Sequence, residues 1–271
     1  MKLFFRKSGA GEPLVILHGL YGSSDNWMGI ARKLSEHFTV WTPDLRNHGQ
    51  SPHDQVHTYQ AMKEDLADFF DEHIPGKAAL MGHSMGGKVA MWFAADYPER
   101  VKNLIVADIA PKDYLLEEDE SQYHFHRNAL LAMLELSETP VNGRQELEER
   151  LSEKIDKKDV IQFLVKNSRF NREVQRMEWK INVESLYDNL EEIVGGVNDR
   201  WFEGRVPVIA YPVTFIRGLE SKYIQDQDIS WIRGIYPEAD FIGIPGAGHW
   251  LHAEEPEMFL AAVMEALKKS S

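Results

Sequence analysis

Residues Gly82 to Gly86 read Gly-His-Ser-Met-Gly, the G-x-S-x-G spacing that presents a serine nucleophile between two glycines. The apolar run Ala78 to Met81 precedes this motif, and the helical pattern MGGKVAMWFAADY follows it. A serine at such a strand-to-helix turn has a strained backbone that pushes its hydroxyl out above the sheet. The N–H groups at the start of the helix point toward charge that develops during acyl transfer. The motif therefore predicts Ser84 as the nucleophile and the amide of Met85 as one oxyanion donor.

A second glycine-rich segment is predicted to supply the other oxyanion donor. His18-Gly19-Leu20-Tyr21-Gly22 follows the apolar run Leu14 to Leu17, at the sheet edge where ligands bind in open α/β proteins. The glycines allow the backbone to turn the N–H of Leu20 inward, and an oxyanion needs two such donors. His18 is interpreted as a residue that orients this loop by hydrogen bonds, not as a catalytic group.

The predicted base is His249. It follows Gly246-Ala247-Gly248, directly after the last apolar strand, so its loop has the backbone freedom to reach back to the serine. The chain order, nucleophile first and histidine last, supports this assignment. His252, three residues later, is the alternative base, whereas His83 is expected to point away from the serine.

Short apolar runs alternate with amphipathic stretches in both parts of the chain that contain these motifs. Runs that are apolar throughout are typical of strands covered on both faces of a parallel sheet. The fold class predicted from this alternation is α/β, with crossover helices between parallel strands. The expected strands are residues 14–17, 38–41, 78–81, 104–107, 213–216 and 241–244, and the expected helices are residues 27–36, 59–73, 85–97, 144–158, 159–167, 221–236 and 255–269.

The alternation stops in the middle of the chain. Residues 112–205 are rich in Glu, Lys, Arg and Leu and contain few strand candidates, which predicts a helical cap inserted into a core of residues 1–111 and 206–271. Within the insertion, the acidic run at residues 117–120 is expected to form a solvated face.

Composition excludes several functions. The net charge of −13 would repel nucleic-acid phosphates, and the absence of cysteine removes thiol nucleophiles and thiolate metal sites. No stretch approaches the apolar length of a membrane span, and the N-terminus lacks a signal-peptide pattern, so a cytoplasmic protein is expected. The oligomeric state remains open between monomer and homodimer.

Five segments together resemble the α/β-hydrolase superfamily, and within it the YbfF-type serine esterases. They are HGLYG, PDLRNHGQS, GHSMGG, DIAPKDY and GAGHWLHAEEP. The resemblance implies the α/β-hydrolase fold with a mostly parallel eight-stranded sheet, a helical cap inserted after the sixth strand, and esterase chemistry without a cofactor or metal. The expected partner is a small-molecule acyl ester or thioester.

The acid of the catalytic triad is harder to assign. In the commonest arrangement of the superfamily it is the third residue after the glycine that ends the seventh strand, but here that residue is Ser221. Asp108, directly after the strand at residues 103–107, and Glu220 are the available carboxylates. The YbfF-type pattern implies Asp108 as the acid, with Ser221 in the hydrogen-bond network around the histidine, and Glu220 remains the alternative.

Two further groups of residues have predicted roles. Asp44 and Arg46 are expected to form an ion pair or loop clamp, with His48 in the same turn. Aromatic residues of the cap and the sheet edge are expected to line a largely apolar pocket for an acyl chain. The predicted pocket residues are Tyr21, Tyr123, Trp179 and Trp250.

The function predicted from these residues is a serine carboxylesterase that forms an acyl-enzyme on its nucleophile. An acyl-CoA thioesterase or another hydrolase would use the same triad with a different pocket, so both remain alternatives. A ligand-binding protein that kept the fold without turnover is the alternative outside enzymology.

Overall fold

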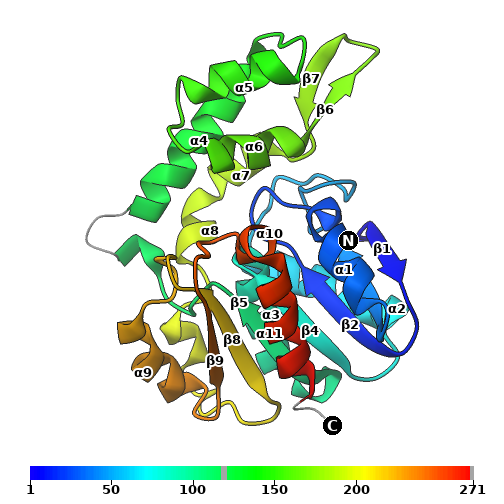
Figure 1. The fold of residues 1–271 in the computed structure, drawn as a ribbon, viewed down its shortest axis with the longest axis vertical. Coiled ribbons are helices and arrows are strands. Elements are labelled where there is room, and N and C mark those ends of the chain that lie inside the picture. Colours follow the sequence, from blue (N-terminus) through cyan, green and yellow to red (C-terminus); the bar gives the residue numbers. More distant parts are fainter. Residues whose placement is uncertain (117–120, 269–271) are drawn as a thin grey trace.

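A mostly parallel sheet forms the centre of the molecule (Figure 1). The computed structural model describes residues 1–116 and 121–268. Within these residues the sheet has seven strands in the order β1-β3-β2-β4-β5-β8-β9, and only β1 is antiparallel to its neighbour. The strands are β1 (Phe5–Ser8), β2 (Glu12–Leu17), β3 (Phe38–Pro43), β4 (Ala78–His83), β5 (Val101–Ala107), β8 (Val213–Gly218) and β9 (Asp240–Ile244).

Helices cover both faces of this sheet, as the continuously apolar strands require. Successive residues of β2 face opposite layers: Leu14 and Ile16 pack with one hydrophobic cluster, and Val15 and Leu17 with the other. The first cluster is completed by α1 (Met28–Leu34) and α11 (Pro256–Lys268), which lie in front of the sheet in Figure 1. The second is completed by α2 (Tyr59–His73), α3 (Met85–Asp96) and α9 (Asp226–Ile235).

The sheet differs from the expectation in its number of strands. The described residues form seven strands in it, not eight, so the insertion follows the fifth strand of the chain, not the sixth. One of the seven, β1, was not expected from the sequence. Its residues, FRKS, are half-buried or exposed at the sheet edge, so they lack the apolar run that marks the inner strands.

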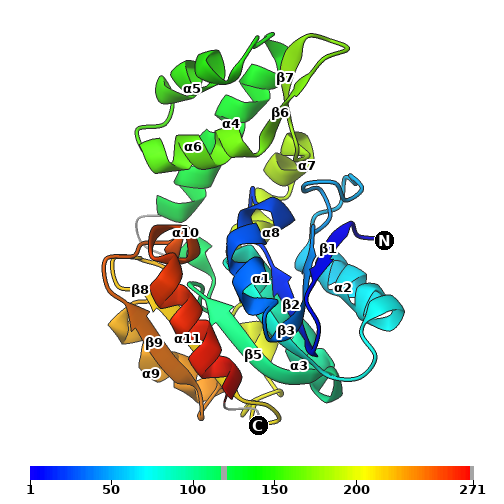
Figure 2. The ribbon, with the colours of Figure 1, turned by 45° about the vertical axis from the view of Figure 1, so that its right-hand side comes forward.

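The chain between β5 and β8 is mainly helical, and most of it projects beyond the sheet (Figures 1 and 2). It also contains a β-hairpin, β6–β7, whose short polar strands gave no signal in the sequence. The acidic run at 117–120 lies outside the described residues, and the boundaries at residues 112 and 205 stay predictions. The elements are α4 (Ser121–Glu138), α5 (Arg144–Ser152), α6 (Lys158–Lys166), β6 (Ser168–Asn171), β7 (Arg176–Trp179), α7 (Val183–Asp188) and α8 (Leu190–Gly195).

A buried lysine of α3 joins the insertion to the sheet at both of its connections. The ammonium of Lys88 donates hydrogen bonds to the carbonyl of Lys112 at 3.0 Å, where the chain leaves the core. It also donates to Val194 at 3.1 Å and Gly196 at 2.6 Å, at the end of α8. Lys88 is 1% exposed, so these three carbonyls replace the water that the ammonium would otherwise bind.

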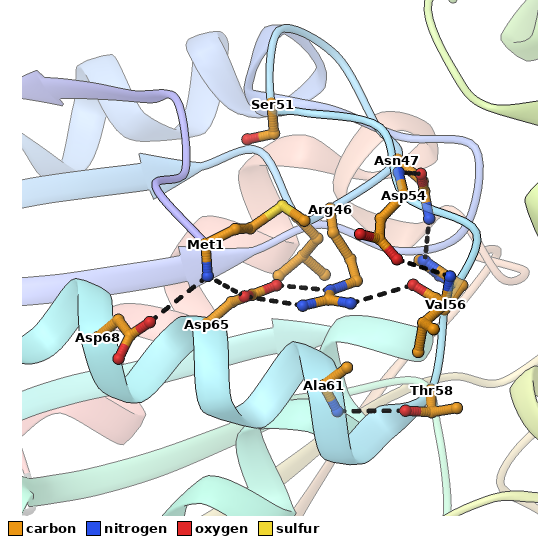
Figure 3. Close-up of polar contacts among 12 residues, drawn as sticks. Met1, Arg46, Asn47, Ser51, Asp54, Val56, Thr58, Ala61, Asp65 and Asp68 are labelled. Carbon is orange, nitrogen blue, oxygen red and sulfur yellow. Dashed lines mark hydrogen bonds and ion pairs between the residues drawn. The ribbon is translucent and has the colours of Figure 1, made fainter.

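The loop after β3 is held by a buried ion pair (Figure 3). The guanidinium of Arg46 donates to both carboxylate oxygens of Asp65 in α2, at 2.6 and 2.9 Å, and to the carbonyl of Val56 at 3.1 Å. Of the two roles expected for Asp44 and Arg46, an ion pair or a loop clamp, the structure shows the clamp: the carboxylate of Asp44 accepts the amides of Ser24 and Gln50. The two residues are therefore separate clamps, because α2 brings a closer carboxylate to the guanidinium.

No helix within residues 1–116 and 121–268 combines the length and the hydropathy needed to span a membrane.

The pair between Arg46 and Asp65 predicts a large stability difference between two variants of α2. Asp65→Ala leaves the buried guanidinium without its partner and should lower the free energy of unfolding by about 3–5 kcal/mol. The control is Asp71→Ala, which removes an exposed pair with Arg100 and should cost less than about 1 kcal/mol. Urea denaturation measures both. Equal losses in the two variants would contradict the role given to burial.

Candidate active site

Ser84 lies at the sharp turn between β4 and α3. Its φ of 52° and ψ of −123° are outside the conformations that L-residues prefer, and its amide donates to the carbonyl of Ala107 at 3.0 Å. The flanking glycines are required by close backbone contacts. A Cβ atom at Gly82 would lie 2.2 Å from the carbonyl oxygen of Gly86, and one at Gly86 would lie 2.4 Å from that of His18. The turn therefore has the strained strand-to-helix geometry that the motif predicts.

The position of this turn follows from the strand order. The strand β2 pairs with β3 on one side and with β4 on the other, so the winding of the sheet reverses between β2 and β4. Ligands of open α/β sheets bind beyond the carboxyl ends of the strands at such a point. The loop His18 to Gly22 and the nucleophile Ser84 follow those two strand ends.

A continuous set of hydrogen bonds joins the three predicted catalytic side chains. The imidazole Nε2 of His249 lies 3.0 Å from the hydroxyl oxygen of Ser84, and its Nδ1 lies 2.8 Å from the carboxylate of Asp108. Burial lowers the pKa of His249, which favours the neutral imidazole that accepts a proton. The three residues come from the ends of β4, β5 and β9, which meet at one edge of the sheet.

The carboxylate of Asp108 is fully buried and each of its oxygens accepts at least one hydrogen bond. One oxygen accepts the amide of Gly218 at 3.1 Å, and the other accepts the hydroxyl of Ser221 at 2.5 Å besides its contact with the imidazole. Burial raises the pKa of Asp108, and the hydrogen bonds from Ser221 and Gly218 oppose that rise. Ser221 therefore supports the charged form of Asp108 in this arrangement.

The two alternative residues lie elsewhere. Glu220 is exposed at the mouth of the site, and its amide donates to the carbonyl of Ala247. The ring of His252 stacks on Trp27, with the ring centroids 4.4 Å apart and an interplanar angle of 13°. The geometry thus pairs Ser84 with His249 and leaves both alternatives outside the hydrogen-bonded set.

Two further residues contact His249: His83, for which the sequence predicted only that it points away from the serine, and Tyr223, for which it predicted no role. The Nε2 atom of His83 lies 2.8 Å from the carbonyl oxygen of His249, and burial lowers the pKa of His83 to about 3, so the neutral ring donates this bond. The ring of Tyr223 stacks on the imidazole of His249 at 3.9 Å between centroids. The position of His83 inside the motif was a usable signal, whereas Tyr223, in the turn after β8, offered none.

The loop that carries Leu20 lies directly beside the nucleophile. A Cβ atom at Gly19 would lie 3.1 Å from the Cβ of Ser84. The amide of Tyr21 donates to Nε2 of His48 at 3.3 Å, and Gly22 donates to Gly19, so the amides that follow Leu20 are already bonded. The oxyanion role of Leu20 and Met85 stays a prediction, and Met85 is the first residue of α3, where helix geometry leaves amides unpaired.

His18 makes the structural hydrogen bonds expected of it. Its Nε2 accepts the amide of Leu45 at 2.9 Å, so its Nδ1 carries the proton and donates to the carbonyl of Gly19 at 2.9 Å. Burial lowers the pKa of His18, in keeping with a neutral ring. The loop after β2 and the loop after β3 are therefore held together by a histidine bridge.

A cavity of about 400 Å³ opens above Ser84. Two of the predicted pocket residues, Tyr21 and Trp250, line it. The other two, Tyr123 and Trp179, are not among its lining residues; the indole of Trp179 instead donates to the carbonyl of Met133 inside the insertion. The sequence shows which residues are aromatic, but it does not show which face of each helix in the insertion points toward the sheet.

Other side chains of the insertion line the cavity instead. They make its wall more polar than the largely apolar pocket that the sequence predicted. Phe125 and Phe163 contribute aromatic surface, and Lys157 and Asp159 contribute charges. His126 of α4 links two core tyrosines, since its ring nitrogens lie 3.1 Å from the hydroxyl of Tyr21 and 3.3 Å from that of Tyr223.

A family model for the alpha/beta hydrolase fold matches residues 12–256. The chain belongs to this family. It is 36% identical over 256 residues to the esterase YbfF of Escherichia coli (strain K12), covering 94% of this chain and 93% of that protein. It is 37% identical over 268 residues to the sn-1-specific diacylglycerol lipase ABHD11 of Danio rerio, covering 97% of this chain and 81% of that protein.

Solved structures include a close match over the whole chain. A marine microorganism esterase superposes with a TM-score of 0.87 at 42% sequence identity, covering 97% of this chain and 98% of that chain. The agreement extends over sheet and insertion alike, because nearly all of both chains is aligned.

The contacts of the two carboxylates predict different effects on turnover. Asp108→Asn should lower kcat for an ester by a factor on the order of 10³ to 10⁴, because an amide at this position favours the wrong imidazole tautomer. Glu220→Gln changes an exposed side chain and should alter kcat by less than about threefold. Steady-state kinetics on p-nitrophenyl acetate compares them. A larger loss in Glu220→Gln would reverse the assignment of the acid.

The hydroxyl of Ser221 predicts a smaller effect of its own. Ser221→Ala removes one donor from the buried carboxylate of Asp108 and should lower kcat about tenfold, the equivalent of one hydrogen bond to a charged group. Ser221→Thr retains a hydroxyl and is the matched control. If the pH–rate profile and kcat of Ser221→Ala equal those of the unchanged protein, the hydroxyl has no part in catalysis.

Proposed function

We propose that the protein is a serine carboxylesterase that hydrolyses acyl esters of small molecules through an acyl-enzyme on Ser84. One observation carries the proposal: the hydrogen bonds that run from Asp108 through His249 to the hydroxyl of Ser84. Nucleophile, base and orienting acid are then within reach of one another, as nucleophilic acyl transfer requires.

The first half of the reaction forms the acyl-enzyme. The hydroxyl oxygen of Ser84 attacks the ester carbonyl carbon while Nε2 of His249 accepts the hydroxyl proton. Asp108 stabilises the imidazolium that forms and keeps Nδ1 protonated. The imidazolium then donates its proton to the oxygen of the leaving alcohol as the carbon–oxygen bond breaks.

The second half releases the acid. Water takes the place of the alcohol, His249 removes one of its protons, and the hydroxide attacks the acyl carbon. The imidazolium returns that proton to the oxygen of Ser84. In both halves the amides of Leu20 and Met85 stabilise the negative charge on the carbonyl oxygen.

The names of the relatives agree with ester chemistry. The Escherichia coli protein is called an esterase, the Danio rerio protein a diacylglycerol lipase, and the marine protein an esterase. Since the same triad also serves thioester cleavage, a thioester remains the second substrate class to be tested. The cytoplasmic location expected from the sequence is kept as part of the proposal.

The nucleophile is tested by covalent labelling and turnover together. A fluorophosphonate probe should label Ser84 of the folded protein, and Ser84→Ala should lose the label and lower kcat by about 10⁶-fold, as removal of a serine nucleophile does elsewhere. Mass spectrometry locates the label, and p-nitrophenyl and acyl-CoA esters report turnover. Hydrolysis by Ser84→Ala close to the rate of the unchanged protein would refute the proposal. If the protein cleaves only the acyl-CoA substrates, it is a thioesterase and not a carboxylesterase.

A further inference from the structure

A second, smaller cavity adjoins Ser84 and shares part of its wall with the large one, namely Leu20, Ser84, Gln122, His126 and Tyr223. Its volume is about 30 Å³, and Leu20, Ser84 and Met85 line it on the catalytic side. The remaining wall is mainly apolar and aromatic, and it is contributed by both core and insertion. Its chief residues are Tyr59, Ile109, Tyr114, Ile193 and Val194.

The two cavities differ in whether His249 lines them. His249 lines the large cavity and is absent from the wall of the small one. The leaving alcohol must receive its proton from Nε2 of His249, so the alcohol has to occupy the side of Ser84 that the imidazole faces. The acyl chain, bonded to the other side of the carbonyl carbon, then points toward the small cavity.

We infer that the small cavity is the acyl-binding pocket and that it restricts the enzyme to short, uncharged acyl groups on bulkier alcohols. This inference rests on the proposed esterase function. Each water-sized group needs roughly 10–15 Å³ of cavity volume, so the small cavity of about 30 Å³ holds about two or three carbon atoms. With the carbonyl carbon at Ser84, these are acetyl, propionyl and butanoyl groups.

Hydrogen bonds fix two of the walls of this pocket. The hydroxyl of Tyr59 donates to the carbonyl of Ile193 at 2.8 Å. The hydroxyl of Tyr114 accepts the amide of Ala110 at 2.9 Å and donates to the carbonyl of Tyr223 at 2.7 Å. Both rings are buried, so a longer chain would have to break buried hydrogen bonds to displace them.

Lys88, which lines the pocket, does not make it an anion site. The ammonium of Lys88 already donates to the carbonyls of Lys112, Val194 and Gly196, and an ammonium has three protons. A carboxylate at the end of the acyl chain would find no unused donor on this group. Although Gln122 and His126 also line the pocket, most of its wall is apolar or aromatic, and burying a carboxylate there would be costly, so the pocket favours a neutral acyl chain.

The experiment is a chain-length series of p-nitrophenyl esters, from acetate through butanoate and hexanoate to octanoate. For the unchanged protein we expect kcat/KM to fall at least tenfold between butanoate and octanoate, since one methylene that fits or clashes in a pocket changes specificity by about 10- to 200-fold. Ile193→Ala should raise the ratio of hexanoate to acetate hydrolysis about tenfold, and the milder Ile193→Val about threefold, because both enlarge the pocket.

The matched control is Phe163→Ala in α6, which lines the large cavity and not the small one. It should change KM for all these esters alike and leave the ratio of hexanoate to acetate unaltered. A flat or rising profile up to octanoate in the unchanged protein, or an unchanged ratio in both Ile193 variants, would overturn the inference.

Fluorophosphonate labelling separates this failure from failure of the proposed function. If Ser84 is labelled and the acetate is cleaved while the chain-length profile is flat, the esterase proposal stands and the assignment of the small cavity is wrong. If Ser84 is not labelled and no ester is cleaved, both are wrong.

Discussion

The buried carboxylate of Asp108 is the interaction on which the candidate site depends. It accepts hydrogen bonds from the amide of Gly218, the hydroxyl of Ser221 and the imidazole of His249, and so joins the ends of β5 and β8 to the loop after β9. A fully buried carboxylate is costly unless its oxygens are hydrogen-bonded, and these partners satisfy them. The same bonds that reduce this cost also orient the base toward Ser84.

Close packing of the backbone fixes the position of Ser84. The chain at Gly82, Gly86 and His18 approaches so closely that no side chain fits between, and this contact places the loop His18 to Gly22 beside Ser84. The ring of His83 then donates to the carbonyl of His249, so the motif that contains Ser84 also holds the loop of His249 in place. Strain at Ser84 persists because the surrounding contacts determine its conformation from several sides.

The insertion completes the site and gives it two unequal cavities. Its helices supply Phe125 and Phe163 to the large cavity, Ile193 to the small one and His126 to both. The bonds from Lys88 to both connections of the insertion keep that second wall against the core. Under the proposed function, substrate selection would depend on how the insertion is anchored, since residues of the insertion complete the walls of both cavities.

The amino-acid sequence by itself predicted the alternation of buried strands and helices, the strained turn at Ser84 and a loop that brings His249 to that turn, because periodicity and glycine spacing are local signals. The resemblance to YbfF-type esterases pointed to Asp108. Local signals did not predict the edge strand β1, whose residues are half-buried or exposed, or the strands of the hairpin β6–β7. The pairing of Arg46 with Asp65, the stacking of Tyr223 on His249 and the residues that line each cavity were decided only by the tertiary structure. These are contacts between side chains whose directions depend on how whole helices pack, and spacing along the chain does not encode that packing.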